Sequence, residues 1–229
     1  MRERVLILVL LIAACGGDDG MDDGAGAVDD GEFPYLVDLR VWQYADGRAN
    51  LGACLYRYSL CESLGTVEVE HGNQAVTLGH DRESSGEWYV GTFATTAAGE
   101  PFRFTWSGAD EQSPVTGEVW LPDEFTITAP VSGSAVSAAK PVTLEWTGGS
   151  PGGLMAWGYS ASCIDGTIND FDHLVPDSGR VEISTDQLAV DNGCSVNLWL
   201  ERLRRGTTSY SRANIMATRS RYVDVTVGP

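Results

Sequence analysis

Oxygen-bearing side chains crowd one short polar stretch in the second half of the chain. Asp165, Asn169, Asp170 and Asp172 follow one another closely, and Ca²⁺ binds several such oxygen ligands at short range. Their spacing does not match the loop of an EF-hand, and polar loops commonly join the strands of a protein. We therefore expect a polar loop without a metal here, and calcium binding by these residues is the alternative.

Serine and histidine chemistry has few candidate positions. The stretch GYSAS at residues 158–162 departs from the G-x-S-x-G nucleophile elbow at its final residue. His71 and His80 lie close to carboxylates in the sequence, but without the spacing of a metal or acid–base motif, and we expect both at the solvated ends of hairpins. The sequence therefore predicts a protein that is not an enzyme, with no catalytic residue and no cofactor.

Seven tryptophans are available as core or binding residues. Side chains along a strand alternate between two faces, so the phase of a tryptophan against its apolar neighbours predicts where it points. Four share the phase of their neighbours and are expected in the core: Trp88, Trp106, Trp146 and Trp157. Trp42, Trp120 and Trp199 have the opposite phase. We expect these three to be covered by a loop or by another module, and the alternative is that they anchor a binding partner.

A basic group stands out near the C-terminus. It consists of Arg202, Arg204, Arg205, Arg212, Arg219 and Arg221. We expect these side chains to form the solvated face of a hairpin, and a local anion-binding strip is the alternative. The whole chain has a formal net charge of -17. Binding to nucleic acid, which needs clustered lysines and arginines, is therefore not expected.

The chain has five cysteines, and four of them can pair. Cys54, Cys61, Cys163 and Cys194 allow three connectivities. Pairing Cys54 with Cys61, and Cys163 with Cys194, keeps each disulfide within one half of the chain. Both members of the second pair share the phase of apolar residues in their expected strands, which favours a disulfide inside the core. The remaining cysteine is Cys15.

The N-terminal residues have the order of an export signal. Two arginines precede an unbroken apolar run, residues 5–12, and two alanines, as in signal peptides. The run is too short for a bilayer, which takes about 20 apolar residues to cross. The stretch LIAAC at residues 11–15 resembles the lipobox of bacterial lipoproteins. This resemblance implies that residues 1–14 are removed and that Cys15 becomes the lipidated first residue of the mature chain.

Residues 15–32 are expected to form a flexible linker. They are rich in glycine and aspartate and include no lysine or arginine, so they cannot bury enough apolar surface to fold. Coil statistics give this linker a reach of roughly 20 to 25 Å. Two or more acyl chains hold a protein stably at a membrane. With glycine at position 16, the lipoprotein resemblance implies an exported protein at the outer membrane, facing the periplasm or the cell surface, if the organism has one.

The rest of the chain has the alternation of strands and almost no helical periodicity, which predicts an all-β fold. The first expected strands cover residues 35–43, 51–58, 66–70, 75–79, 88–93, 102–106 and 117–121. Those of the second half cover residues 142–146, 154–163, 180–184, 194–203, 209–217 and 222–227. Between two of the later strands, Ser184 or Thr185 is expected to cap a single helical turn.

The pattern of strands restarts near Pro122. The stretches FTITAPVSG from Phe125 and KPVTLEWTG from Lys140 resemble the opening strands of bacterial immunoglobulin-like and fibronectin type III-like modules. The length of the chain suits modules of about 100 residues. We therefore expect two β-sandwich domains, at residues 33–123 and 124–229, with the resemblance strongest in the second.

These features together predict a membrane-anchored envelope lipoprotein with a binding or structural role. Its expected partners are the membrane, through the lipid anchor, and another envelope protein or a glycan. A glycan-binding or calcium-dependent adhesion module is the first alternative. An envelope hydrolase, with a site assembled from scattered residues, is the second.

Overall fold

The computed structural model describes residues 36–44, 46–57, 60–61, 65–81, 88–94, 96, 99–108, 114–150, 152–164, 166–184, 186–188, 190, 192–211 and 213–228. The expected signal peptide, Cys15 and the linker lie outside the described residues. Among the residues that are described, no helix has the length and apolar character needed to cross a membrane.

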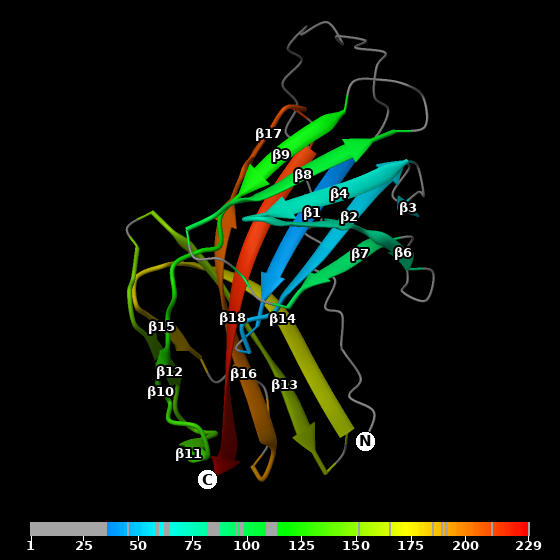
Figure 1. Ribbon diagram of the computed structural model, residues 1–229. Coiled ribbons are helices and arrows are strands. Elements are labelled where there is room, and N and C mark those ends of the chain that lie inside the picture. Colours follow the sequence, from blue (N-terminus) through cyan, green and yellow to red (C-terminus); the bar gives the residue numbers. More distant parts are fainter. Residues whose placement is uncertain are drawn as a thin grey trace, which may run out of the picture.

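The described chain folds into strands arranged in three sheets, so the predicted all-β class with β-sandwich packing is confirmed (Figure 1). Sheet A is ten-stranded, with the main order β14-β13-β16-β18-β1-β2-β7-β6, and with β11 beside β18 and β3 beside β2. Its strands are β1 (Leu36–Gln43), β2 (Ala49–Arg57), β3 (Leu60–Cys61), β6 (Gly79–Asp81), β7 (Trp88–Phe93), β11 (Ser134–Ser137), β13 (Leu154–Cys163), β14 (Gly166–Pro176), β16 (Ser195–Arg205) and β18 (Ala213–Gly228).

Two smaller sheets pack on sheet A. Sheet B has the order β17-β9-β8-β4-β5, with β17 at Thr207–Thr208, β9 at Val115–Val119, β8 at Phe102–Ser107, β4 at Thr66–His71 and β5 at Gln74–Thr77. Sheet C has the order β10-β12-β15, with β10 at Ile127–Ala129, β12 at Val142–Trp146 and β15 at Arg180–Ile183. In Figure 1, sheet B crosses the upper part of sheet A, and sheet C lies beside its lower part.

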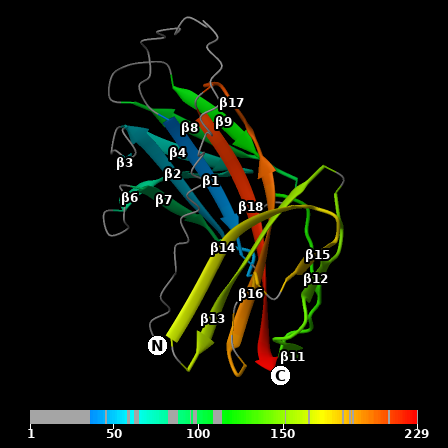
Figure 2. The ribbon, with the colours of Figure 1, turned by 180° about the vertical axis from the view of Figure 1, so that it is seen from behind.

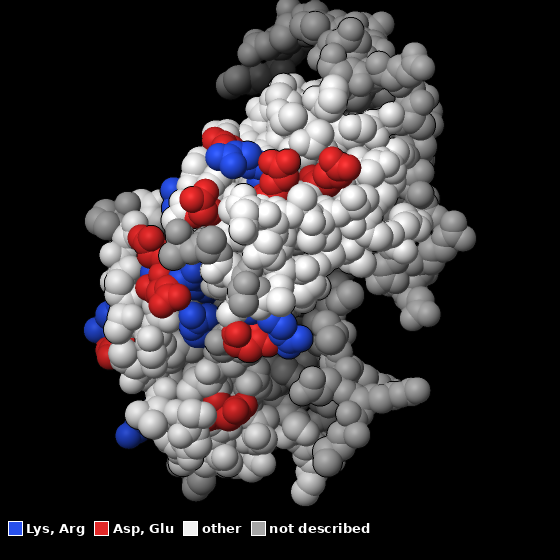
Figure 3. Space-filling view, in the orientation of Figure 1, with Lys and Arg blue, Asp and Glu red and all other residues white. Residues whose placement is uncertain are grey.

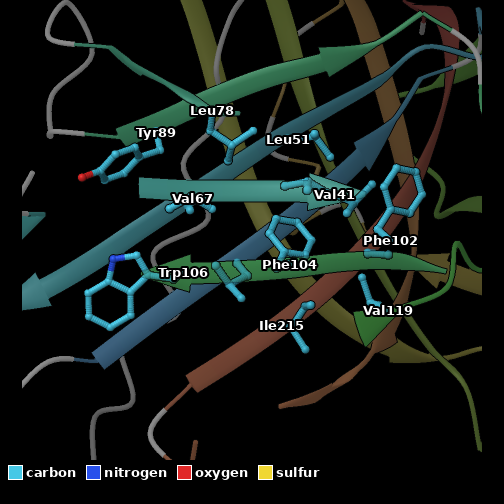
Figure 4. Packing of buried hydrophobic residues seen from close by; sticks show 14 of the residues in the cluster. Val41, Leu51, Val67, Leu78, Tyr89, Phe102, Phe104, Trp106, Val119 and Ile215 are labelled. Carbon is cyan, nitrogen blue, oxygen red and sulfur yellow. The ribbon is translucent and has the colours of Figure 1, made fainter. Parts of the chain in front are cut away.

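Each small sheet encloses one hydrophobic core against sheet A. In the first core, Val37, Leu39 and Val41 of β1 face Phe104 and other residues of sheet B, and Figure 4 shows side chains of both sheets meeting there. The second core lies between sheets A and C and includes Leu144, Trp157 and Leu198. The alternation read from the sequence predicted these side chains inward because a strand half-buried on one face requires it.

Strand β18 joins the two cores. It runs the length of the molecule in both views (Figure 1 and Figure 2), pairing in parallel with β1 and antiparallel with β16. Ile215 and Ala217 enter the first core, and Val223 and Val225 enter the second. The sequence predicted two strands here, because the apolar alternation stops at residues 218–222. Backbone pairing on both sides carries the strand through this polar interval.

The division into domains at residues 123 and 124 stays a prediction. Apart from residues 210–217, which return to the first core, the boundary separates the residues of the two cores. The described chain therefore has two cores built on one continuous sheet.

Strand β14 corrects the expected polar loop after residue 164. It pairs with β13 along its length, with a register shift between Trp157 and Tyr159. The polar residues of this stretch occupy an edge strand, where one side of the backbone needs no partner strand and polar side chains are tolerated.

The disulfide between Cys163 and Cys194 is confirmed, with an S–S distance of 2.01 Å and a Cα–Cα distance of 4.4 Å. It links the end of β13 to the residue before β16, at the edge of the second core. Cys54 is buried and also disulfide-bonded. The side chain of Cys61 lies outside the described residues, so the pairing of Cys54 with Cys61 stays a prediction.

The expected helical turn is also observed after β15. The Ser184 amide donates to Gln187 Oε1 at 3.0 Å, and the Gln187 amide approaches Ser184 Oγ at 3.3 Å. This reciprocal arrangement is a capping box.

Arg202 corrects the expectation of a solvated arginine face. Only 3% of Arg202 is exposed, and its Nε lies 2.8 Å from Asp177 Oδ2. Its Nη1 donates to the carbonyls of Asp123 and Glu124 at 3.1 and 3.2 Å, and its Nη2 donates to the carbonyl of Gly148 at 2.7 Å. Arg202 thus ties β16 to the segment that leads from sheet B into sheet C.

Asp177 completes this contact from the other side. Its side chain is fully buried, and Oδ1 accepts from the indole Nε1 of Trp146 at 2.7 Å and from Arg202 Nη2 at 3.2 Å. Because both charged partners are out of water, removing one leaves the other uncompensated.

Arg202→Met is therefore expected to lower the free energy of unfolding by about 3 to 5 kcal/mol. Urea denaturation followed by tryptophan fluorescence measures this loss. The matched control is Arg48→Met, whose ion pair with Asp46 is exposed, with 62% and 46% of the side chains accessible. The control should cost less than about 1 kcal/mol. Equal losses in the two variants would contradict the role assigned to Arg202.

Candidate functional site

The face of sheet A that points away from both cores is called the outer face here. Both described cores lie on the opposite face of the sheet, yet most residues of the outer face are buried. Its residues occupy the alternate positions of five strands. They are Asp38, Arg40 and Trp42 in β1, Asn50, Gly52 and Cys54 in β2, Trp88 in β7, Trp199 and Glu201 in β16, and Ser220 and Tyr222 in β18. The outer face therefore combines aromatic rings with charged and hydroxyl groups.

Trp42 lies partly buried against the neighbouring strand. A Cβ atom added at Gly52 would lie 2.7 Å from Trp42 Cη2, so the glycine makes room for the indole. The Trp88 ring lies 6.4 Å from Trp42, at an interplanar angle of 53°. The sequence predicted Trp88 in the core. Trp88 is buried, but Tyr89 enters the first core and Trp88 faces outward.

Trp199 packs closely on Gly158 of β13, where a Cβ atom would collide with its ring. Only 5% of Trp199 is exposed. Its direct neighbour across the strand pair is Tyr222, which is 47% exposed. Trp199 is therefore a buried member of the outer face, whereas Tyr222 presents an aromatic surface to solvent.

Glu201 places a carboxylate close enough to two tyrosines to influence their pKa values. It is 7% exposed, and its Oε1 accepts from Ser220 Oγ at 2.8 Å. Burial raises the pKa of Tyr222 to about 12, and the charges of Glu201 and Tyr44 add to this effect. Burial and then Glu201 also raise the pKa of Tyr44. The pKa values of Tyr44 and Tyr222 are therefore both raised by burial and by the charge of Glu201.

This group is suited to binding. A tyrosine offers an apolar ring and a polar tip, and small-molecule sites commonly combine aromatic side chains with a few polar groups that set orientation. Both phenols stay protonated at neutral pH and can donate hydrogen bonds, and the buried carboxylate can accept them.

The structure brings two of the three outward tryptophans to this face. Trp42 and Trp199 both belong to it, and Trp120 does not. Trp120 follows β9 and lies partly buried, with the guanidinium of Arg204 5.7 Å from its ring centroid. Neither Tyr44 nor Glu201 carries a sequence signal for this site. Tyr222 does carry a sequence signal: its phase is opposite to that of Val223 and Val225, which indicates that it faces outward.

The calcium alternative stays a prediction. Asp165 and the side chain of Asp172 lie outside the described residues. Asn169 and Asp170 are successive residues of β14, so their side chains point to opposite faces. Asp170 Oδ2 lies 2.8 Å from Nε2 of His173. Among the described residues, no group of three or more His, Cys, Asp or Glu side chains could hold a metal ion.

His71 differs from its expected place at a solvated hairpin end. It is 1% exposed, and its ring stacks on Phe102 at a centroid distance of 4.0 Å. Its Nδ1 lies 3.3 Å from the Pro101 carbonyl oxygen. His71 is therefore a core residue of the first sandwich.

The likeness of this chain to known proteins is structural. No protein-family model and no curated protein matches the chain. Among solved structures, the chain is similar to the fibronectin(III)-like modules of CbhA from Clostridium thermocellum. The two are 12% identical with a TM-score of 0.29, over 84% of this chain and 94% of that chain.

The raised tyrosine pKa values predict a loss of stability at high pH. An unfolded tyrosine ionises near pH 10, whereas folded Tyr222 holds its proton to about pH 12. Stability from this group is present below pH 10 and falls as the pH rises toward 12. Absorbance at 295 nm should show a late phenolate transition that is lost in Tyr222→Phe. In Glu201→Gln the transition should move to lower pH, and an unchanged curve would contradict the contact with Glu201.

Proposed function

We propose that this chain is an exported, lipid-anchored envelope protein that binds a partner through the outer face of sheet A and does not act as an enzyme. The anchor is supported by the lipobox-like stretch ending at Cys15 and by the acidic linker that follows it. The linker would let the folded body reach roughly 20 to 25 Å from the membrane.

One observation carries the binding role. Tyr222 of the outer face is 47% exposed and lies directly across the strand pair from Trp199, and the next pair of residues on the same face is Glu201 and Ser220, joined by a hydrogen bond. Trp42 adds a partly buried ring on the same face, and the buried Trp199 packs against Gly158. Aromatic residues in such positions are the usual anchors of an interface.

A glycan is the second candidate ligand. Sugar rings have apolar faces and hydroxyl edges, and an aromatic ring beside hydrogen-bonding groups suits both. Tyr222 supplies an exposed ring and a phenol that can form hydrogen bonds, and Trp42 supplies a partly buried ring. An envelope protein would use the same surface through more extensive contacts.

The anchor is tested by changing the cysteine in cells that export the protein. Cys15→Ser should move the protein from the membrane fraction to the soluble fraction, because no acyl chain can then be attached. Asp18→Ser, in the same linker, is the control and should stay in the membrane fraction. Mass spectrometry of the mature protein should find acyl chains on Cys15, and an unmodified thiol would contradict the proposal.

Binding is tested with variants of the outer face. The double variant Trp42→Ala and Tyr222→Ala should lose the partner found by cross-linking in the native envelope, or the sugar found on a glycan array. The control is Val131→Ser, which changes an exposed side chain, 71% accessible, in the turn before β11. A partner or sugar bound equally by the double variant would contradict the assignment of this face.

A further inference from the structure

Four arginines of two paired strands belong to the face of sheet A that carries the cores. This arginine strip consists of Arg202 and Arg204 in β16 and Arg219 and Arg221 in β18. Arg202 is directly opposite Arg219 in the strand pair. The strip lies between the two cores, and charged side chains of both signs gather over the middle of this side of the molecule (Figure 3).

The segment between β9 and β10 crosses the arginine strip. Phe125 lies under two guanidinium groups, at 5.0 Å from Arg202 and 5.7 Å from Arg221. Trp120 lies 5.7 Å from the guanidinium of Arg204. The aromatic rings contact the planar faces of the guanidinium groups. The N–H groups at the edges of each guanidinium can still form hydrogen bonds.

The charges of the arginine strip are unevenly compensated. Arg202 has the buried carboxylate of Asp177. Arg219 is paired with Glu124, at 3.3 Å, and 82% of that glutamate side chain is exposed. Within the described part of the chain, no carboxylate lies within ion-pair distance of Arg204 or Arg221. The strip therefore has an excess of positive charge. Like charges on adjacent strands destabilise a sheet, and a bound anion would reduce this repulsion.

Arg219 is the strip member whose environment is least favourable to its buried Nε. Its side chain is 10% exposed, and its buried Nε has no hydrogen-bond partner among the described residues. Burial lowers the pKa of Arg219, the charge of Glu124 opposes this, and the charges of Arg221 and Arg202 lower the pKa further.

We propose that Arg204, Arg219 and Arg221 bind an oxyanion of the phosphate or sulfate class, at the junction between the two cores. Guanidinium groups bind such anions through paired, charge-assisted hydrogen bonds. Arg204 is exposed and Arg221 is partly exposed, so an anion can approach from solvent. The site is separate from the outer face and does not depend on the proposed function.

Two sources can supply this chemistry. One is a free oxyanion in solution, and the other is the phosphate of an anionic lipid headgroup. Glu124 competes with either, because its carboxylate occupies an Arg219 donor. Removing the Glu124 carboxylate should therefore tighten anion binding, whereas removing an arginine should weaken it.

The test uses the full chain with Cys15→Ser and inorganic phosphate, titrated at constant ionic strength and followed by calorimetry. Binding should be saturable. Arg219→Gln and Arg221→Gln should each weaken it about tenfold or more, because a charge-assisted hydrogen bond is lost. Glu124→Gln should tighten it. Arg103→Gln is the control, since that arginine pairs with Glu118 in an exposed position, and it should bind as the parent does.

A second arm uses vesicles of phosphatidylcholine with and without phosphatidylglycerol. Arginine-dependent binding of inorganic phosphate identifies a free oxyanion, and arginine-dependent binding of the anionic vesicles alone identifies a headgroup. If Arg219→Gln fails to fold, Arg204→Gln replaces it, because that side chain is exposed. No saturable binding in either arm, or binding unchanged in the arginine and Glu124 variants, would overturn the proposal.

Discussion

The buried contact between Arg202 and Asp177 holds the two halves of this protein in one arrangement. Asp177 also accepts from Trp146 of sheet C, and Arg202 also donates to the carbonyls of Asp123 and Glu124. One guanidinium therefore fixes sheet A, sheet C and the segment between sheets B and C. A buried ion pair contributes more to uniqueness than to net stability in some proteins, and here it joins sheet A to the segment that leads into the second sandwich.

The continuity of β18 has a consequence for function. Because one strand serves both cores, the outer face extends without interruption from β7 to β14. Tyr44 and Trp42 come from the first half of the chain, and Glu201 and Tyr222 come from the second. Two sandwiches joined only by a linker would have kept these groups apart. The shared sheet brings them together on a single surface.

The two faces of sheet A differ in their chemistry near the junction. The outer face has a buried carboxylate among tyrosines, and the opposite face has the arginine strip. Adjacent residues of a strand point to opposite faces. Glu201 and Tyr222 therefore belong to the outer face, and their neighbours Arg202 and Arg221 belong to the arginine strip. An acidic protein thus has a local basic site directly behind an acidic, aromatic one.

The sequence alone determined the all-β class, most strands, the inward alternation of residues such as Val37 and Trp157, and the Cys163–Cys194 disulfide. These follow from local alternation and turn residues. Tertiary structure decided the continuity of β18, strand β14, the outward position of Trp88, and the burial of His71 and Arg202. Such features depend on which sheet covers which face and on which distant carboxylate meets each charge. Local alternation shows that a side chain belongs to one of two faces, and only the packed fold determines what lies against that face.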